Sequence, residues 1–218
     1  MVEEASVKRN IRLIVLAVFI FAFLTIASVA NKLSNPRILN AYELRDYGAM
    51  MFEEPKELLE FSLIDQQGEL FGSGQLLGQW TLVFFGFTQC ADTCSTTMAV
   101  LAETYQGLKP EVQSDLNIVL VTVDPQRDTP EVLAKYLSRF DESFIGVSGN
   151  HAGLMGLAAQ LHAAYEPEFV EKENYQVGHS GNLMLINPRG QLQGYFRPPF
   201  AHGGLRVAWR SIRETYKG

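Results

Sequence analysis

The segment from Trp80 to Cys94 reads WTLVFFGFTQCADTC, and its pattern indicates the fold class. Residues 80–85 form a short, continuously apolar run, which is typical of a strand buried on both faces. The residues that follow lead into a segment, residues 92–105, for which we predict a helix. Because buried strands that alternate with helices are the mark of α/β proteins, this stretch predicts a layered α/β domain.

Strands and helices keep alternating along the rest of the chain. Gly68 supplies the positive φ of a turn between two short strands, and Thr129-Pro130 combines a capping side chain with the proline that opens helices. From this order we expect an α/β sandwich with a central mixed sheet covered on both faces. The expected strands are residues 60–63, 69–71, 80–85, 117–123, 144–147, 183–186 and 191–196, and the expected helices are residues 92–105, 130–139, 152–161 and 205–216.

The composition excludes several classes of protein. With 218 residues the chain has room for one sizeable domain and an appendage, and with 47% hydrophobic and 11% aromatic residues it is too apolar to be disordered. Two cysteines are too few for a disulfide scaffold. The net charge is -6, and no cluster of Lys and Arg follows the first dozen residues, so the chain lacks the basic surface that nucleic-acid binding requires.

An uncharged apolar segment near the N-terminus predicts a membrane anchor. Leu13–Ala30 is 18 residues long, which meets the requirement of about 17 to 25 residues for crossing a bilayer and exceeds the apolar region of a cleaved signal. Cleavage after the small-x-small triplet Ser28-Val29-Ala30 is the alternative. Lys8, Arg9 and Arg12 precede the segment, and by the positive-inside rule they keep the N-terminus in the cytoplasm.

The sequence therefore divides the chain into four parts. We expect a cytoplasmic tail over residues 1–12, a transmembrane anchor over residues 13–30, a tether over residues 31–57 and a folded domain over residues 58–218. This orientation makes the chain a single-pass protein of the inner membrane. Its C-terminal domain would lie in the periplasm or an equivalent compartment outside the cytoplasm.

Both cysteines of the chain lie where the strand of residues 80–85 meets its helix, at the sheet edge where ligands of open α/β sheets gather. We expect Cys90 in the loop and Cys94 in the first helical turn, where backbone N–H groups and the helix dipole lower the pKa of a thiol. The spacing puts both sulfurs on one side, close enough for a small cation or a disulfide. An inert structural disulfide is the alternative in an exported protein, although so short a loop would add little stability.

A metal site needs a third ligand besides the two cysteines. The chain has four histidines, and His179 is placed just before a predicted core strand, at the same lip of the sheet as the cysteine loop. For His151, His162 and His202 the usual interpretation is a solvated or hydrogen-bonded side chain. Met98 is a soft residue one turn further along the first helix, but a methionine that faces a sheet more often fills the core.

Four motifs stand in order along the chain: Phe84–Thr88 (FFGFT) with Cys90 and Cys94, Val121–Pro130 (VTVDPQRDTP), Gly178–Ser180 (GHS) and Leu185–Gly190 (LINPRG). Together they resemble the Sco/SenC family, whose members are membrane-anchored, thioredoxin-fold copper proteins that assemble the dinuclear copper site of cytochrome c oxidase. The resemblance covers roughly residues 48–200, and several motifs in register are more specific than one.

This resemblance implies a thioredoxin-like fold and a copper site. It implies that Cys90, Cys94 and His179 are the copper ligands. Asp92, between the cysteines, and Asp124, after the second buried strand, match acidic positions of the family motif, so the resemblance places them beside the ligands.

The chain departs from the family pattern next to each cysteine. The family usually carries proline there, whereas this chain has Ala91 and Ser95. Because proline fixes φ and starts helices well, its absence predicts a looser ligand loop. Neither position supplies a ligand, so the resemblance still implies copper binding.

An exported thioredoxin-like thiol–disulfide oxidoreductase is the alternative from a different class. Such enzymes resemble one another in a Cys-x-x-Cys pair and in a proline, usually cis, that faces the pair before the third core strand. This chain has three residues between its cysteines and His179-Ser180 at the corresponding place. A peroxiredoxin-like peroxidase matches less well, because it needs a single reactive cysteine.

The copper hypothesis carries a mechanism with it. Two thiolates and one imidazole suit Cu(I) in a three-coordinate site, and Cu(II) is the alternative state of the cargo. A disulfide between Cys90 and Cys94 would prevent binding, so the redox state of the pair would act as a gate. The expected partners are the copper-site subunit of cytochrome c oxidase, a thiol reductase and another copper chaperone, and anchorage would raise the effective concentration near a membrane-bound client.

Overall fold

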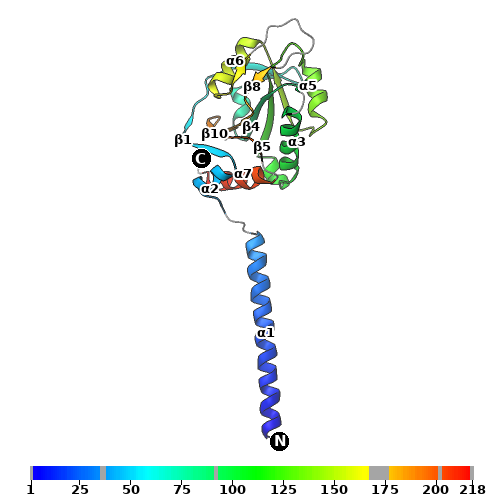
Figure 1. Cartoon of the computed structure of the whole chain (residues 1–218), viewed down its shortest axis with the longest axis vertical. Coiled ribbons are helices and arrows are strands. Elements are labelled where there is room, and N and C mark those ends of the chain that lie inside the picture. Colours follow the sequence, from blue (N-terminus) through cyan, green and yellow to red (C-terminus); the bar gives the residue numbers. More distant parts are fainter. Residues whose placement is uncertain (1, 35–37, 91–92, 167–176, 201–202, 217–218) are drawn as a thin grey trace. The chain divides into compact units, whose positions relative to one another are not determined.

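The structure is a computed structural model of the chain, and it describes residues 2–34, 38–90, 93–166, 177–200 and 203–216. The chain forms two compact units, Met1–Ile38 and Leu39–Gly218. Figure 1 labels their main helices and strands.

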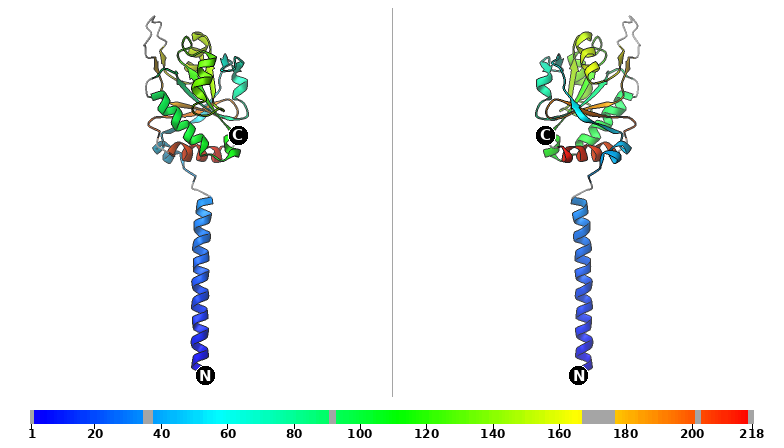
Figure 2. Two further views of the ribbon diagram at one scale, coloured as in Figure 1. Left: turned by 90° about the vertical axis from the view of Figure 1, so that its right-hand side faces the viewer. Right: turned by 90° about the vertical axis from the view of Figure 1, so that its left-hand side faces the viewer.

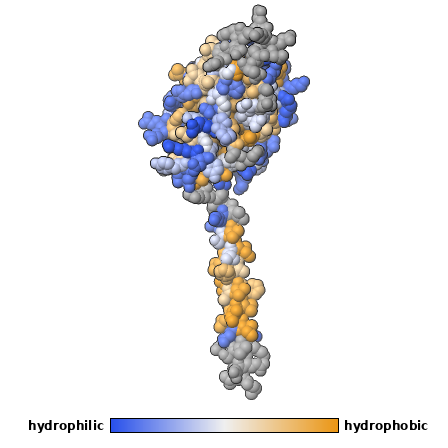
Figure 3. All heavy atoms as spheres, viewed as in Figure 1, coloured by the Kyte–Doolittle hydropathy of each residue, from blue (hydrophilic) through white to orange (hydrophobic). Residues whose placement is uncertain are grey.

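The first unit contains the helix α1 (Val2–Ser34). Within it, Asn10–Lys32 spans 23 residues and is long and apolar enough to cross a membrane, judged by length and composition. Large hydrophobic side chains such as Phe19 and Phe23 are exposed along it, and Figure 3 shows a hydrophobic surface over most of the described part of this helix. A helix that is apolar on all sides calls for an apolar environment. The segment expected to form the anchor, residues 13–30, lies inside this span.

An eight-stranded mixed sheet forms the centre of the second unit. The strands are β1 (Ala49–Lys56), β2 (Ser62–Asp65), β3 (Leu70–Gly72), β4 (Trp80–Gly86), β5 (Leu116–Thr122), β6 (Ile145–Ser148), β7 (Tyr165–Glu166), β8 (Gly178–His179), β9 (Leu183–Ile186) and β10 (Leu192–Phe196). Their order in the sheet is β1-β10-β9-β4-β5-β6-β2-β3, while β7 and β8 form a separate pair. The neighbours β4, β5 and β6 run parallel to one another, β9 runs antiparallel to β4, and β10 runs antiparallel to β9.

Helices cover both faces of this sheet. They are α2 (Ala41–Asp46), α3 (Thr93–Gln106), α4 (Pro110–Gln113), α5 (Pro130–Leu137), α6 (His151–Gln160) and α7 (Gly204–Thr215), with a short 3-10 turn at Ser73–Leu76. Every residue of β4 and of β9 is buried, which requires cover on each side, and Figure 2 shows the helices around the sheet. The continuously apolar strands and the amphipathic helices therefore share one core.

The two ends of β4 have different neighbours. Trp80, its first residue, packs edge-on against Trp209 of α7, with ring centroids 5.2 Å apart. Gly86, its last residue, leads into the cysteine loop. Because a strand is extended, at about 3.3 Å per residue, Trp80 and Gly86 mark opposite ends of the sheet. The helix α7, which contacts Trp80, therefore lies at the end opposite to the cysteine loop (Figure 1).

The predicted elements are found, with ends that shift by a residue or two in most cases. Thr129 caps α5, its hydroxyl accepting a hydrogen bond from the backbone N–H of Val132, and Pro130 is the first helical residue, as expected. The turn at Gly68, where φ is +81°, joins β2 and β3 as expected. The correspondence is 60–63 with β2, 69–71 with β3, 80–85 with β4, 117–123 with β5, 144–147 with β6, 183–186 with β9, 191–196 with β10, 92–105 with α3, 130–139 with α5, 152–161 with α6 and 205–216 with α7.

The expected tether over residues 31–57 is wrong in its C-terminal part. The folded unit begins at Leu39 rather than at residue 58. Asn40 caps α2, and β1 pairs with β10 so that Ala49 faces Phe196. As an edge strand, β1 is buried at Ala49 and otherwise partly or fully exposed, and its sequence is apolar only over residues 49–52.

Candidate metal centre

The loop between β4 and α3 carries both cysteines. Cys90 lies in this loop and Cys94 in the first turn of α3, as predicted. The backbone N–H of Cys90 donates to the carbonyl oxygen of Phe87 at 3.3 Å, which closes a turn in the loop. Both cysteines are free thiols, Cys90 partly exposed and Cys94 buried. The helix α3 thus positions the sulfur of Cys94, and the loop before it positions the sulfur of Cys90.

His179 joins the two cysteines to form a group of three possible metal ligands. Its Nε2 atom lies 3.4 Å from the Sγ atom of Cys94. The ligand atoms of Cys90, Cys94 and His179 all lie within 4.8 Å of one another. Since ligand bonds of about 2.0 to 2.3 Å let two ligands of one ion stand up to about 4.6 Å apart, these atoms need to move little to share one small cation.

The surroundings of His179 fix the orientation of its ring. The Nδ1 atom lies 3.1 Å from the carbonyl oxygen of Ser180, which only accepts, so Nδ1 is the donor in this contact. The rings of Phe84 and Phe87 stand edge-on to the imidazole, each with a centroid 5.9 Å away. The lone pair of Nε2 is therefore the one that faces Cys94, in the arrangement that suits a metal ligand.

The expectation of a lowered thiol pKa is wrong for Cys94. Burial raises the pKa of this thiol, and the hydrogen bond with the side chain of Cys90 raises it further. Only 1% of Cys94 is exposed, so its thiolate would lose hydration that the helix terminus does not replace. Met98, one turn further along α3, is fully buried and belongs to the core, as expected.

Gly86 gives the sulfur of Cys94 the room it occupies. A Cβ atom at residue 86 would lie 3.2 Å from Sγ of Cys94 and 2.9 Å from the ring of Phe84. A larger residue at this position would therefore require the Phe84 ring or the sulfur of Cys94 to shift. Sequence reasoning missed this role, although a glycine inside a strand is a known signal of close approach.

The two acidic residues expected beside the ligands have different outcomes. Asp92 lies outside the described residues. Asp124 is buried and forms an ion pair with Arg127, and its backbone N–H donates to the hydroxyl of Thr122 at 2.9 Å. Asp124 therefore belongs to the loop after β5, and the structure gives it a partner other than the three ligands.

The other histidines are engaged elsewhere or lie outside the description. The Nδ1 atom of His151 is 2.6 Å from the hydroxyl of Tyr165, and the two rings stack. The Nε2 atom of His162 is 2.9 Å from the Nζ atom of Lys56. For these two, the hydrogen-bonded interpretation is confirmed. His202 lies outside the described residues.

Comparison with known proteins places this chain in a family. The family model for SCO1/SenC matches residues 51–206. The chain belongs to the SCO1/SenC family. A relative within it, the SCO2-like protein of Rickettsia prowazekii, is 36% identical over 72% of this chain and 74% of its own length.

Solved structures of SCO1/SenC proteins share this fold. The structure of ScoI from Arabidopsis thaliana with copper bound has a TM-score of 0.65 and 28% identity, over 72% of this chain and 98% of that one. The structure of yeast Sco1 with copper bound has a TM-score of 0.69 and 26% identity, over 75% and 91%. The family predicted from the motifs and the thioredoxin-like fold with a central mixed sheet are both confirmed.

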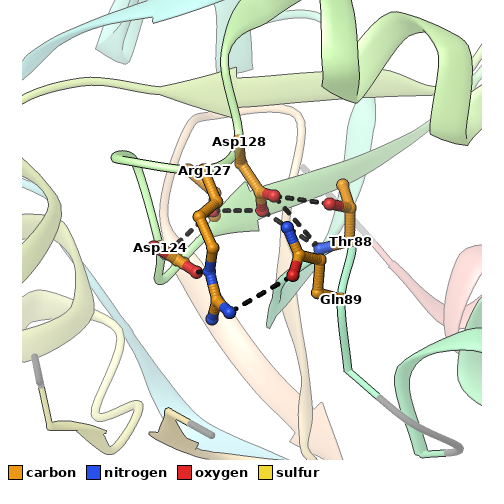
Figure 4. Close-up of polar contacts among 6 residues, drawn as sticks. Thr88, Gln89, Asp124, Arg127 and Asp128 are labelled. Atoms are coloured by element: carbon orange, nitrogen blue, oxygen red, sulfur yellow. Dashed lines mark hydrogen bonds and ion pairs between the residues drawn. The ribbon is translucent and has the colours of Figure 1, made fainter. Parts of the chain in front are cut away.

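One buried residue of this SCO1/SenC chain was missed at the site. Asp128 is fully buried and accepts hydrogen bonds from the backbone N–H and the hydroxyl of Thr88, in the loop that leads to Cys90. Figure 4 shows these contacts. A signal was present, because Asp128 stands in the motif VTVDPQRDTP four residues after Asp124.

Proposed function

We propose that this SCO1/SenC protein binds one copper ion through Cys90, Cys94 and His179 and delivers it to the dinuclear copper site of cytochrome c oxidase during assembly. The observation that carries this proposal is the convergence of two sulfurs and one imidazole nitrogen within 4.8 Å. The copper-bound relatives support the choice of metal. Membership of the family supports the choice of client.

The donor set selects the cargo by its softness. Sulfur and imidazole ligands favour copper over hard cations such as Mg²⁺ and Ca²⁺. The pair of cysteines and His179 provide three donors, the number that suits Cu(I). Binding requires both thiols to lose their protons, so the raised pKa of Cys94 means that copper has to displace a firmly held proton.

The same cysteines supply a redox gate in this proposal. Their sulfurs are free and within 4.8 Å of each other. Oxidation would form an S–S bond and release two protons, with two electrons passing to an oxidised thiol partner, and it would remove two of the three ligands. A thiol reductase would restore the binding form, and another copper chaperone would load it.

The helix α1 supports a membrane-anchored placement of this copper site. Its span Asn10–Lys32 is the anchor in the proposal, and the basic residues Lys8, Arg9 and Arg12 favour a cytoplasmic N-terminus. The domain would then face the periplasm or an equivalent space. An anchored carrier meets a membrane-bound client at raised effective concentration.

Substitution of each ligand tests the copper site. In the reduced full chain in detergent, Cys90→Ala, Cys94→Ala and His179→Ala should each raise the Kd for Cu(I) by more than the roughly 10- to 100-fold cost of losing an outer hydrogen-bond partner. Competition with a chromophoric chelator measures the Kd. His151→Ala is the matched control and should leave the Kd unchanged. Normal affinity in His179→Ala would remove His179 from the ligand set.

A reporter fusion tests the proposed orientation. A fluorescent protein that folds only in the cytoplasm should be dark when it is fused after Gly218, because the positive-inside rule sends that end across the membrane. The same reporter placed before Met1 should fluoresce and serves as the control. Bright cells from the C-terminal fusion would reverse the topology.

A further inference from the structure

The carboxylate of Asp128 occupies an unusual place for a charged group. It is fully buried, and burial raises its pKa although three hydrogen bonds oppose this. Burial of a carboxylate costs free energy unless hydrogen bonds replace its hydration. Because this buried carboxylate lies next to the ligand loop, its hydrogen bonds to that loop indicate its role.

The hydrogen bonds of Asp128 join the ligand loop to the neighbouring strand. On the loop side, the N–H of Thr88 donates at 3.1 Å and the Thr88 hydroxyl at 2.6 Å. On the other side, the hydroxyl of Thr122, the last residue of β5, donates at 2.6 Å. Figure 4 shows Asp128 reaching Thr88. One side chain therefore ties the start of the cysteine loop to the sheet.

The backbone of Asp128 is itself held in place. Its N–H donates to the carbonyl oxygen of Asp124 at 2.9 Å, and its own carbonyl oxygen accepts from the hydroxyl of Ser148 at 3.3 Å. The backbone of Asp128 is thus held in place by β6 and by the turn after β5. Its side chain in turn holds the loop at Thr88, two residues before Cys90.

A second link runs closer to the surface. The Nη1 atom of Arg127 donates to the side-chain oxygen of Gln89 at 3.3 Å, and the guanidinium lies over the ring of Phe87, 5.7 Å from its centroid. Because Gln89 is exposed, water competes for this hydrogen bond. The buried link through Asp128 is the stronger of the two.

We propose that Asp128 is a positioning residue that holds the loop so that the sulfur of Cys90 faces Cys94 and His179 before copper arrives. The inference rests on the proposed copper site, and it adds a residue that touches no ligand. The loop lacks the two prolines expected beside its cysteines, so hydrogen bonds have to supply rigidity that the backbone does not. Without the link, binding would have to order the loop as well.

Two measurements on the full chain in detergent test this role. In the reduced, metal-free protein, Asp128→Ala should raise the alkylation rate of Cys90 several-fold, as followed by mass spectrometry of the labelled peptides. The same variant should raise the Kd for Cu(I) by roughly 10- to 100-fold. Asp128→Asn keeps an oxygen that accepts from the N–H of Thr88, so its Cys90 alkylation rate and its Kd for Cu(I) should lie between those of the wild type and of Asp128→Ala. If Asp128→Ala does not fold, Asp128→Asn alone should show smaller changes in the same directions.

A control variant separates positioning from general stability. Ile212→Ala removes a buried side chain from α7, at the far end of the sheet, and it should change neither the alkylation rate nor the Kd. Equal effects of the Ile212 and Asp128 variants would overturn the proposal. A wild type that binds no copper, combined with faster alkylation in Asp128→Ala, would refute the copper function and leave the hold on the loop supported.

Discussion

Replacing His179 with proline should abolish copper binding and leave disulfide reduction intact or improved. The imidazole is the third donor of the group, and its Nε2 atom stands 3.4 Å from the sulfur of Cys94. Disulfide exchange needs that same approach to be open, because a substrate disulfide has to dock in line with a thiolate. A proline at this place is what thioredoxin-like reductases present to their substrates. The two functions therefore compete for one position, and the substitution should exchange one for the other.

Side-by-side assays measure this exchange. Insulin reduction reports the thiol activity and chelator competition reports the Kd for Cu(I), in the wild type, His179→Pro and His179→Ala. The alanine variant separates loss of the imidazole from gain of the proline, and it should lose copper without gaining reductase activity. The copper proposal fails if the wild type reduces insulin as fast as a thioredoxin and His179→Pro loses that activity while its copper affinity is unchanged.

Removal of residues 39–57 should strongly destabilise the folded unit. Leu44 and Ala49 are buried in it, and β1 covers the edge of β10, whose residues Leu192 and Phe196 are also buried. Burial of one leucine contributes about 1.5 to 3 kcal/mol. With the lost cover of β10, the free energy of unfolding should fall on the order of 5 kcal/mol, a large share of the roughly 5 to 15 kcal/mol of a typical domain.

Urea unfolding followed by circular dichroism measures this loss. A fragment of residues 58–218 should unfold at a much lower urea concentration than a fragment of residues 39–218, if it folds at all. The longer fragment is the matched control, because it keeps α2 and β1 and removes only the first unit. Equal midpoints for the two fragments would restore residues 39–57 to the role of a tether.

Local patterns were sufficient to predict the centre of the fold. The strands β4, β5 and β9 are nearly continuous apolar runs, and such runs are buried on both faces wherever they occur. The edge strand β1 is apolar only in its first half, residues 49–52, and it continues with two glutamates and a proline, because an edge strand is more exposed to solvent. The start of α2 did leave a local trace, since Asn40 and Glu43 form a capping box in which each side chain accepts a backbone hydrogen bond of the other residue.

The site was predictable only in part. The identity of the three possible ligands follows from motifs, but the state of Cys94 does not. Its position at a helix start predicts a lowered thiol pKa, whereas its burial, which depends on the packing of Gly86 and the whole sheet, raises it. The link from Asp128 to Thr88 spans 40 residues of sequence, and no local pattern encodes a contact of that range.

The two edge strands of the sheet determine how readily copies of this chain pair with one another through their backbones. Its two outermost strands are β1 and β3. The strand β3 has only three residues, while β1 carries the exposed Glu53 and Glu54, a proline at residue 55, and an irregular register between Met51 and Lys56. Short, charged and irregular edges are poor templates for pairing with another chain. Copies of this chain at high concentration would therefore remain separate rather than join through the edges of their sheets.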